Sequence, residues 1–158
     1  MWKKIKPYVY SVLIALLVGG ASAYLTRNNM NIYERINMPP LSPPSWLFPV
    51  VWGILYTLMG ISSAIVYLKG KNEDVDTKSA LNVYLLQLAV NFAWSIIFFN
   101  MQAFLLAFLW ILLLWVLIIV MIVRFREISP LAAWLQIPYL LWVTFAAYLT
   151  FMVWILNR

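Results

Sequence analysis

The chain has no cysteine and no histidine among its 158 residues, and only 10% of its residues carry charge. Without cysteine no disulfide can form, and without both residue types the usual ligands of zinc and haem iron are missing. Methionine and tyrosine are the only remaining side chains that ligate haem iron. The sequence therefore predicts no metal site and no required cofactor.

Charge is scarce because apolar residues make up 65% of the chain and aromatic residues 17%. This composition lies far outside the range of soluble domains. All eleven lysines and arginines and all five acids fall between or beyond the apolar runs, since a charge at the bilayer centre costs about 3 kcal/mol or more. We predict an all-α polytopic membrane protein, a single domain made of a bundle of five transmembrane helices.

Each predicted span is close to the roughly 20 residues that a helix needs to cross a bilayer. The spans are residues 8–26, 46–68, 79–100, 102–123 and 130–156. Residues 79–123 are almost continuously apolar, so the chain is expected to turn back at Asn100-Met101-Gln102, the only polar break. The first run is too long and too poor in small residues at its end for a cleaved signal peptide, and we interpret it as a retained helix.

Lysine and arginine are unequally divided between the two sides of this topology. Arg27, Arg35 and Arg158 share one side, and the other side carries Lys3, Lys4, Lys6, Lys69, Lys71, Lys78, Arg124 and Arg126. Cytoplasmic loops carry the excess of such residues, so the N-terminus is expected in the cytoplasm and the C-terminus on the opposite side. The net charge of +6 is then an insertion signal and an attraction to membrane lipid headgroups, and nothing in it favours nucleic acid.

The connection between the first two spans, residues 27–45, is long for so compact a protein. It contains four prolines and several apolar residues, among them Tyr33. A connection of this length is usually a lid or a binding element. We predict that it is a lid over a pocket.

Polar and aromatic residues in the third span recur at helical spacing. Gln87, Asn91, Trp94, Ser95 and Phe98 fall on one stripe, which is expected to face the bundle interior. Two interpretations of the amides stay open: bonds between helices worth about 0.6 kcal/mol each, or contacts to a ligand.

Two further stripes lie on the second and fifth spans. Pro49, Trp52 and Tyr56 form the first, and Trp142, Phe145, Ala146 and Leu149 form the second. Trp52, Trp94 and Trp142 sit inside spans and not at the ends where interfacial belts form, which favours a pocket over a belt. Pro138 removes a backbone hydrogen bond within the fifth span and predicts a kink beside Trp142.

Small residues in the first span repeat every four positions at Ala15, Gly19 and Ala23. Such a face allows backbones to approach closely. It is interpreted first as a packing face within the bundle and second as a dimer face.

Three runs resemble one known family. They are MPPLSPPSWLFPVVWGILY at 38–56, LAVNFAWS at 88–95 and PYLLWVTFAAYL at 138–149. Together they are similar to the tryptophan-rich sensory protein family, also called translocator protein or peripheral-type benzodiazepine receptor, over essentially the whole chain. The resemblance is to bacterial members, which implies a bacterial cell membrane.

The resemblance implies a homodimer of five-helix bundles that binds porphyrins and drug-like aromatic ligands beneath the first loop. The implied ligand-binding residues are Tyr33, Pro49, Trp52, Tyr56, Gln87, Asn91, Trp94, Phe98, Trp142, Phe145, Ala146 and Leu149. A motif associated with cholesterol in animal members is absent here, because Leu141 and Tyr148 are too far apart and Tyr148 is far from Arg158. Arg27 and Arg35 are candidates to pair with porphyrin propionates by charge-assisted hydrogen bonds, or they are solvated loop charges.

Three functions follow, in order of preference. The first is a membrane receptor or sensor for porphyrins such as protoporphyrin IX, linked to tetrapyrrole regulation. The second is light- and oxygen-dependent degradation of protoporphyrin IX, with Trp52 and Trp142 as candidate catalytic residues. The third is transport of porphyrin or lipid, which the absence of ionisable residues in the spans and the odd number of helices disfavour.

Overall fold

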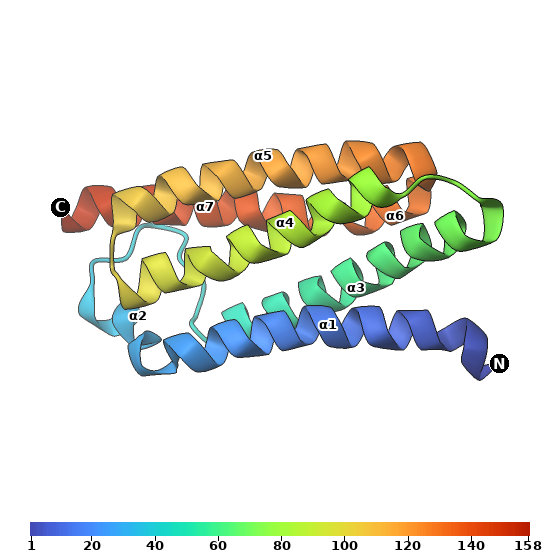
Figure 1. Ribbon diagram of the computed structural model, residues 1–158. Helices are drawn as coiled ribbons and strands as arrows, with labels where there is room; N and C mark the ends of the chain where they lie inside the picture. The colour runs from blue at the N-terminus through green and yellow to red at the C-terminus, as the bar shows by residue number, and fades with distance from the viewer.

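The computed structural model describes residues 1–158 as a bundle of long helices with no strand (Figure 1). The elements in order are α1 Trp2–Thr26, η1 Arg27–Asn29, α2 Ile32–Arg35, α3 Leu47–Glu73, α4 Lys78–Ser95, η2 Ile96–Asn100, α5 Phe104–Ile128, α6 Pro130–Leu135 and α7 Ile137–Asn157. Five stretches are long and apolar enough to cross a membrane. The prediction of an all-α protein with five membrane helices is confirmed.

The helices extend beyond the predicted spans at their charged ends. Helix α1 begins at Trp2 and includes the N-terminal lysines, and α3 continues through residues 69–73 before the chain turns. The turn itself is only residues 74–77, with Asp74 in the left-handed conformation at φ 53°. Charged residues end an apolar run but do not end a helix, because helix propensity continues into the interfacial region.

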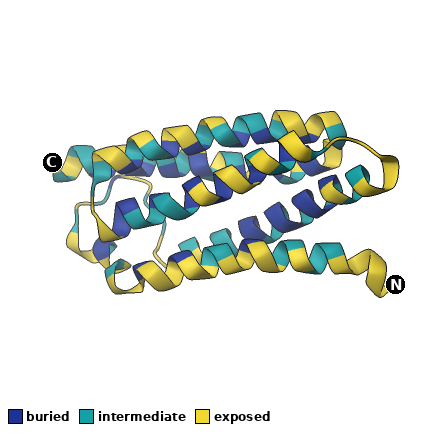
Figure 2. Ribbon diagram, in the orientation of Figure 1, coloured by how far each residue is buried: buried dark blue, intermediate teal, exposed yellow.

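Each helix presents one buried face to the others. Helix α1 packs chiefly against α3, α4 against α5, and α5 against α7 and α6. Figure 2 shows buried positions on the inward faces of α3 and α4 and exposed positions on the outward side of α1 and α5. Many exposed side chains are large and apolar, such as Leu17, Leu109 and Leu141, as expected where lipid is the solvent.

Two glycines set the spacing between α1 and α3. A Cβ on Gly60 would lie 2.5 Å from the Val12 Cα, and a Cβ on Gly19 would lie 2.5 Å from the Tyr56 ring. Ala15, one turn before Gly19, is fully buried. The small-residue face of α1 therefore packs within the bundle, against α3.

The turn between the third and fourth spans lies where the polar break predicts it. Residues Ile96–Asn100 form a π-helical turn, in which the Met101 N–H donates to the Ile96 carbonyl at 3.0 Å. Gln102 follows with φ 51°, and α5 begins at Phe104. The π turn shifts the side chains that follow it around the helix axis and so changes which of them face the site.

The fifth span is interrupted near Pro138, as predicted. Helix α6 ends at Leu135 and α7 begins at Ile137, with Gln136 between them. The Gln136 N–H donates to the carbonyls of Ala133 and Trp134, so the Ala132 carbonyl lacks its helical partner and instead accepts from the Ser62 hydroxyl at 2.7 Å. A side chain on α3 thus stabilises the interrupted end of α6.

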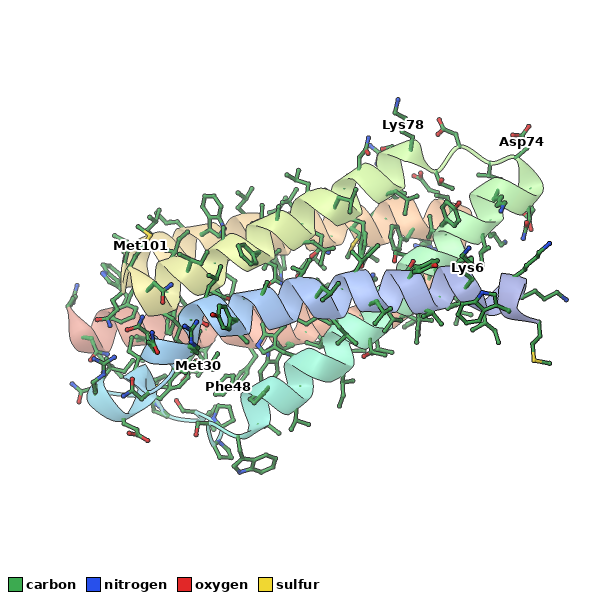
Figure 3. The ribbon with its side chains drawn as sticks, turned by 60° about the horizontal axis from the view of Figure 1, so that its bottom comes forward. Lys6, Met30, Phe48, Asp74, Lys78 and Met101 are labelled. Atoms are coloured by element: carbon green, nitrogen blue, oxygen red, sulfur yellow. The ribbon has the colours of Figure 1, made fainter.

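The two ends of the bundle carry different charge. Lys6, Asp74 and Lys78 lie at one end in Figure 3, and Met30, Phe48 and Met101 lie at the other. The first end, where α1 begins, also contains the end of α5 with Arg124 and Arg126. The eight cations predicted for one side of the membrane therefore share one end of the bundle.

Candidate functional site

A cavity of about 400 Å³ lies at the end of the bundle beneath the connection between α1 and α3. Its walls come from the last turns of α1, the start of α3, the end of α4 with η2, and the middle of α7. The lining residues are Gly19, Ser22, Ala23, Thr26, Met30, Asn31, Tyr33, Ser45, Phe48, Pro49, Trp52, Tyr56, Asn91, Trp94, Ser95, Phe99, Trp142 and Ala146. The volume is within the usual range for a small-molecule pocket.

Aromatic rings dominate the cavity walls and contact one another. The Tyr33 ring stacks on Phe48 at 5.2 Å and meets the edge of Phe99 at 5.8 Å. Phe48 in turn packs edge-on against Trp142 at 5.8 Å. These contacts join α2, α3, η2 and α7 into one continuous aromatic surface, of the kind that binds flat apolar ligands.

Hydrogen bonds fasten the connecting segment across this end of the bundle. The Asn37 N–H donates to the Asn157 side-chain oxygen at 2.9 Å, and the Asn157 amide donates back to the Asn37 carbonyl at 2.9 Å. Near the middle of the segment, the Tyr148 hydroxyl donates to the Pro40 carbonyl at 3.0 Å. Four residues of this segment, Met30, Asn31, Tyr33 and Ser45, line the cavity, and α7 holds the segment in place.

The cavity opens to the outside between α1, the connecting segment and the start of α3. Ala23, Met30 and Pro49 line the cavity and are also exposed, and the exposed fraction of Met30 is 43%. In Figure 3, Met30 and Phe48 lie at the same end of the molecule.

A chain of side-chain hydrogen bonds leads away from the floor of the cavity. The Asn91 amide donates to the Tyr139 hydroxyl at 2.9 Å, and that hydroxyl donates to the Gln87 side-chain oxygen at 2.7 Å. Asn91 lines the cavity, whereas Gln87 and Tyr139 are buried one turn further in. The interpretation of the amides as bonds between helices holds for Gln87, and Asn91 combines such a bond with a position on the cavity wall.

Two cavity tryptophans bury an indole N–H that has no acceptor. These are Trp94 on α4 and Trp142 on α7. Away from the cavity, Trp110 donates to the Val90 carbonyl at 2.8 Å and Trp115 donates to the Thr144 hydroxyl at 2.9 Å. Because buried donors are rarely left unpaired, the two cavity indoles are groups that a small movement or a ligand acceptor would satisfy.

The structure brings eight of the predicted ligand-binding residues to the cavity. They are Tyr33, Pro49, Trp52, Tyr56, Asn91, Trp94, Trp142 and Ala146. The candidate catalytic pair Trp52 and Trp142 is among them. The other four, Gln87, Phe98, Phe145 and Leu149, are not in the lining.

The π turn explains why Phe98 lies behind the wall. In an α-helix the side chain four residues after Trp94 returns to the same face, but a π turn makes i to i+5 bonds and brings the fifth residue there instead. Phe99 accordingly lines the cavity, and Phe98 stacks behind Trp94 at 5.2 Å. On α7, Phe145 is rotated away from the face of Trp142 and Ala146 and packs between Trp142 and Tyr148.

The two loop arginines do not line the cavity. The Arg27 guanidinium lies over the Tyr24 ring, 3.8 Å from its centroid, and donates to the Tyr24 carbonyl at 2.6 Å. It thus contacts the end of its own helix, where a cation is favoured by the helix dipole. Arg35 is exposed at the end of α2. Both lie at the cavity end of the bundle, and propionate pairing stays a prediction for them.

Ten lining residues were not among the predicted ligand-binding residues, although Ser95 stood on the predicted inward stripe and Gly19 and Ala23 on the small-residue face. They are Gly19, Ser22, Ala23 and Thr26 on α1, Met30, Asn31 and Ser45 in the connecting segment, Phe48 on α3, Ser95 on α4 and Phe99 in η2. The four-residue repeat of small residues on α1 was a usable signal, because a face that approaches α3 closely also borders the space between them. Phe48 could have been found as the aromatic residue four positions before Trp52.

The arrangement suits binding of a flat apolar molecule and offers little to acid–base chemistry. No group of three or more metal-binding side chains of the histidine, cysteine, aspartate or glutamate type comes together in the chain. The polar groups at the cavity are amides, hydroxyls and indoles. Such a site provides apolar contact area and a few hydrogen bonds that fix orientation.

The sequence of the chain is similar to those of known proteins. The model of a family described as the TspO/MBR family matches residues 11–155. A protein named tryptophan-rich protein TspO from Chlorobaculum tepidum is 37% identical over 99% of both chains. The tryptophan-rich sensory protein of Cereibacter sphaeroides is 32% identical over 79% of this chain and 76% of that protein. The translocator protein of Homo sapiens is 33% identical over 84% of this chain and 79% of that protein.

The family model spans all five membrane helices, and relatives named as sensory or translocator proteins exceed 30% identity over most of their own length. The resemblance seen in the three sequence runs is confirmed. Together with its five apolar helices, the match establishes that the chain is an integral membrane protein belonging to the TspO/MBR family.

Proposed function

We propose that the protein is a membrane receptor that binds porphyrins, such as protoporphyrin IX, and drug-like aromatic molecules in the cavity beneath residues 27–45. The observation that carries this proposal is the continuous aromatic wall around a cavity of about 400 Å³. The names sensory protein and translocator protein carried by its relatives agree with a receptor role. No cofactor is required, and the porphyrin is the ligand.

A porphyrin has two chemical features that match the cavity, its apolar faces and its carboxylates. Its apolar faces would pack against Trp52, Trp94 and Trp142, which offer large ring areas from three helices. Its carboxylates would stay at the opening, at the end of the bundle that carries Arg27 and Arg35. The macrocycle is larger than most drug-sized ligands, so we expect its carboxylate edge to remain between α1 and α3, near Ala23 and Pro49.

A second candidate function is light- and oxygen-dependent degradation of protoporphyrin IX. The observation that favours it is that Trp52 and Trp142 line the same cavity, so two oxidisable indoles would lie close to a bound porphyrin. In this reaction molecular oxygen is the oxidant and the illuminated porphyrin is the sensitiser. Transport is the least supported function, because the spans carry no charged residue to couple to an ion gradient and five helices cannot form two equal inverted repeats.

The experiment that tests this proposal follows the Soret absorbance of protoporphyrin IX mixed with the purified protein, first in the dark and then under light. Saturable dark binding without loss of the band on illumination supports a receptor, and protein-dependent loss to a new product supports degradation. Trp52→Phe and Trp142→Phe are each expected to keep dark binding within tenfold, about 1.4 kcal/mol, and to abolish any light-driven loss. Trp154→Phe, outside the cavity, is the control. Absence of saturable binding would refute the proposal.

We further propose a bacterial cell membrane as the location, with the N-terminus in the cytoplasm and the cavity in the outer half of the bilayer. The support is the gathering of eight cations at the opposite end of the bundle. A homodimer also remains a proposal. Helix α1 turns its small residues toward α3, so a dimer face would use other surfaces, such as the exposed side of α1 around Gly20.

A further inference from the structure

We propose that Tyr139 is a positioning residue that couples occupation of the cavity to the interruption between α6 and α7. The inference rests on the proposed function, since it assumes that a ligand occupies the cavity. It concerns how a receptor with its site at one end of the bundle transmits occupancy toward the other end.

Two cavity walls on different helices contact the Tyr139 side chain. Asn91 on α4 donates to its hydroxyl at 2.9 Å. Trp52 on α3 packs against its ring, with centroids 6.3 Å apart and the planes at 70°. Tyr139 itself is 1% exposed and is not part of the lining. A ligand that shifts either wall therefore acts on Tyr139 without contacting it.

On its other side, Tyr139 lies next to the point where the fifth span is interrupted. Gln136, the residue between α6 and α7, precedes it by three positions, and Gln136, Tyr139 and Val143 follow the spacing of one buried helix face. Pro138 between them has no backbone N–H to donate. The backbone is therefore held by fewer hydrogen bonds here than elsewhere in the span.

Two buried amides have unused hydrogen-bonding capacity, one bonded to Tyr139 and one three residues before it in the chain. The Gln87 side-chain nitrogen and both polar atoms of the Gln136 side chain are buried and have no partner. Gln87 already accepts from Tyr139 at 2.7 Å. Because buried unpaired amides are costly, a second arrangement in which the Tyr139 hydroxyl accepts from one of these amides competes with the arrangement seen here.

Ligand binding would select between these two arrangements. A ligand acceptor, such as a carbonyl, carboxylate or ring nitrogen, that draws the Asn91 amide toward the cavity frees the acceptor side of the Tyr139 hydroxyl. The hydroxyl then accepts from the Gln136 amide while it still donates to Gln87. This hydrogen bond to Gln136 orders the segment between α6 and α7. The segment lies one turn closer than Tyr139 to the end of the bundle where α1 begins.

The test measures backbone amide exchange in the full-length protein in lipid nanodiscs, with and without saturating protoporphyrin IX in the dark. The native protein is expected to show exchange at least threefold slower between residues 133 and 140 when porphyrin is bound. Tyr139→Phe keeps the ring and its contact with Trp52 but removes the hydroxyl, and it should lose this slowing. Saturation of each variant is checked by the Soret absorbance, so a change in affinity does not alter the result.

A control and a second variant separate coupling from general damage to the fold. Thr150→Val removes another buried α7 hydroxyl, which donates to the Ala146 carbonyl of its own helix and does not line the cavity, and this variant should keep the slowing. Gln136→Met removes the unpaired amide at the interruption between α6 and α7. This variant should bind porphyrin as the native protein does, but porphyrin should not slow its amide exchange at residues 133–140. If Tyr139→Phe does not fold, the amide exchange of Gln136→Met at residues 133–140 tests the proposal.

Unchanged exchange at 133–140 in the porphyrin-bound native protein would overturn the coupling, and so would a native response in Tyr139→Phe or in Gln136→Met. A native protein whose Soret band does not respond to added protein would instead overturn the proposed function. The two failures are therefore distinguishable in the same sample.

Discussion

Replacing Gly19 with alanine is expected to reduce the cavity without breaking the bundle. A Cβ at this position would lie 2.5 Å and 2.6 Å from two carbons of the Tyr56 ring. Carbon atoms at optimal separation are about 3.5–4.0 Å apart, so the ring has to move by about 1 Å. Tyr56 lies against Trp52 at 5.6 Å, and both line the cavity. The ring therefore moves toward the space that a ligand needs.

The size of the effect follows from the cost of overpacking, about 1–3 kcal/mol when the surroundings have to shift. Part of this strain is relieved when the Tyr56 ring moves into the cavity. A ligand has to push the ring back in order to bind. We expect the affinity for protoporphyrin IX to fall by about tenfold, or roughly 1.4 kcal/mol. The thermal midpoint should change little, because a side chain yields in this variant and no backbone has to move.

Two other glycines provide matched controls. A Cβ on Gly20 meets nothing within 4 Å, so Gly20→Ala should leave the affinity unchanged and should not lower the thermal midpoint, since alanine is the better helix former. A Cβ on Gly60 meets the Val12 backbone, so Gly60→Ala should separate α1 from α3 and lower the thermal midpoint. Affinity is measured by dark absorbance titration, and stability by thermal denaturation in the same detergent. Native affinity in Gly19→Ala, or an equal loss in Gly20→Ala, would refute the reasoning.

Two further predictions concern topology and the covering segment. A reporter fused after Arg158 should lie outside the cytoplasm and one inserted at Asn72 inside it, and the same location for both would contradict the five-span topology. Asn157→Leu removes both hydrogen bonds between the Asn157 side chain and the Asn37 backbone, so amide exchange at residues 36–41 should accelerate at least fivefold. Unchanged exchange there would show that the two Asn157 bonds do not hold the segment.

The fold was predictable because the bilayer imposes simple demands. Apolar runs of about 20 residues have to be helices, and the break at Asn100 to Gln102 had to be a turn. Pro138 correctly located the interruption of the fifth span, since proline lacks the N–H that a helix interior uses. What composition did not predict was the extension of α1 and α3 into charged residues.

The site was predictable where its chemistry is conspicuous. Trp52, Asn91 and Trp142 stand out because aromatic and amide side chains at helical spacing in an apolar span need a partner or a cavity. The sequence predicted Phe98 in the cavity lining, whereas Phe99 lies there. The π turn at Ile96–Asn100 causes this shift, and the sequence IIFFN carries no signal for such a turn. The connecting segment's contribution, through Met30 and Asn31, depends on tertiary contacts that no local pattern encodes.

Binding of the ligand in the cavity beneath residues 27–45 can be tested with a cavity-filling variant. Ala146 lines the cavity, whereas Ala89 is exposed on the outer face of α4. The measurement is the dissociation constant of protoporphyrin IX in the dark for Ala146→Phe and for its control Ala89→Phe. We expect at least tenfold weaker binding for Ala146→Phe and native binding for Ala89→Phe. Native binding by a folded Ala146→Phe would place the ligand outside this cavity.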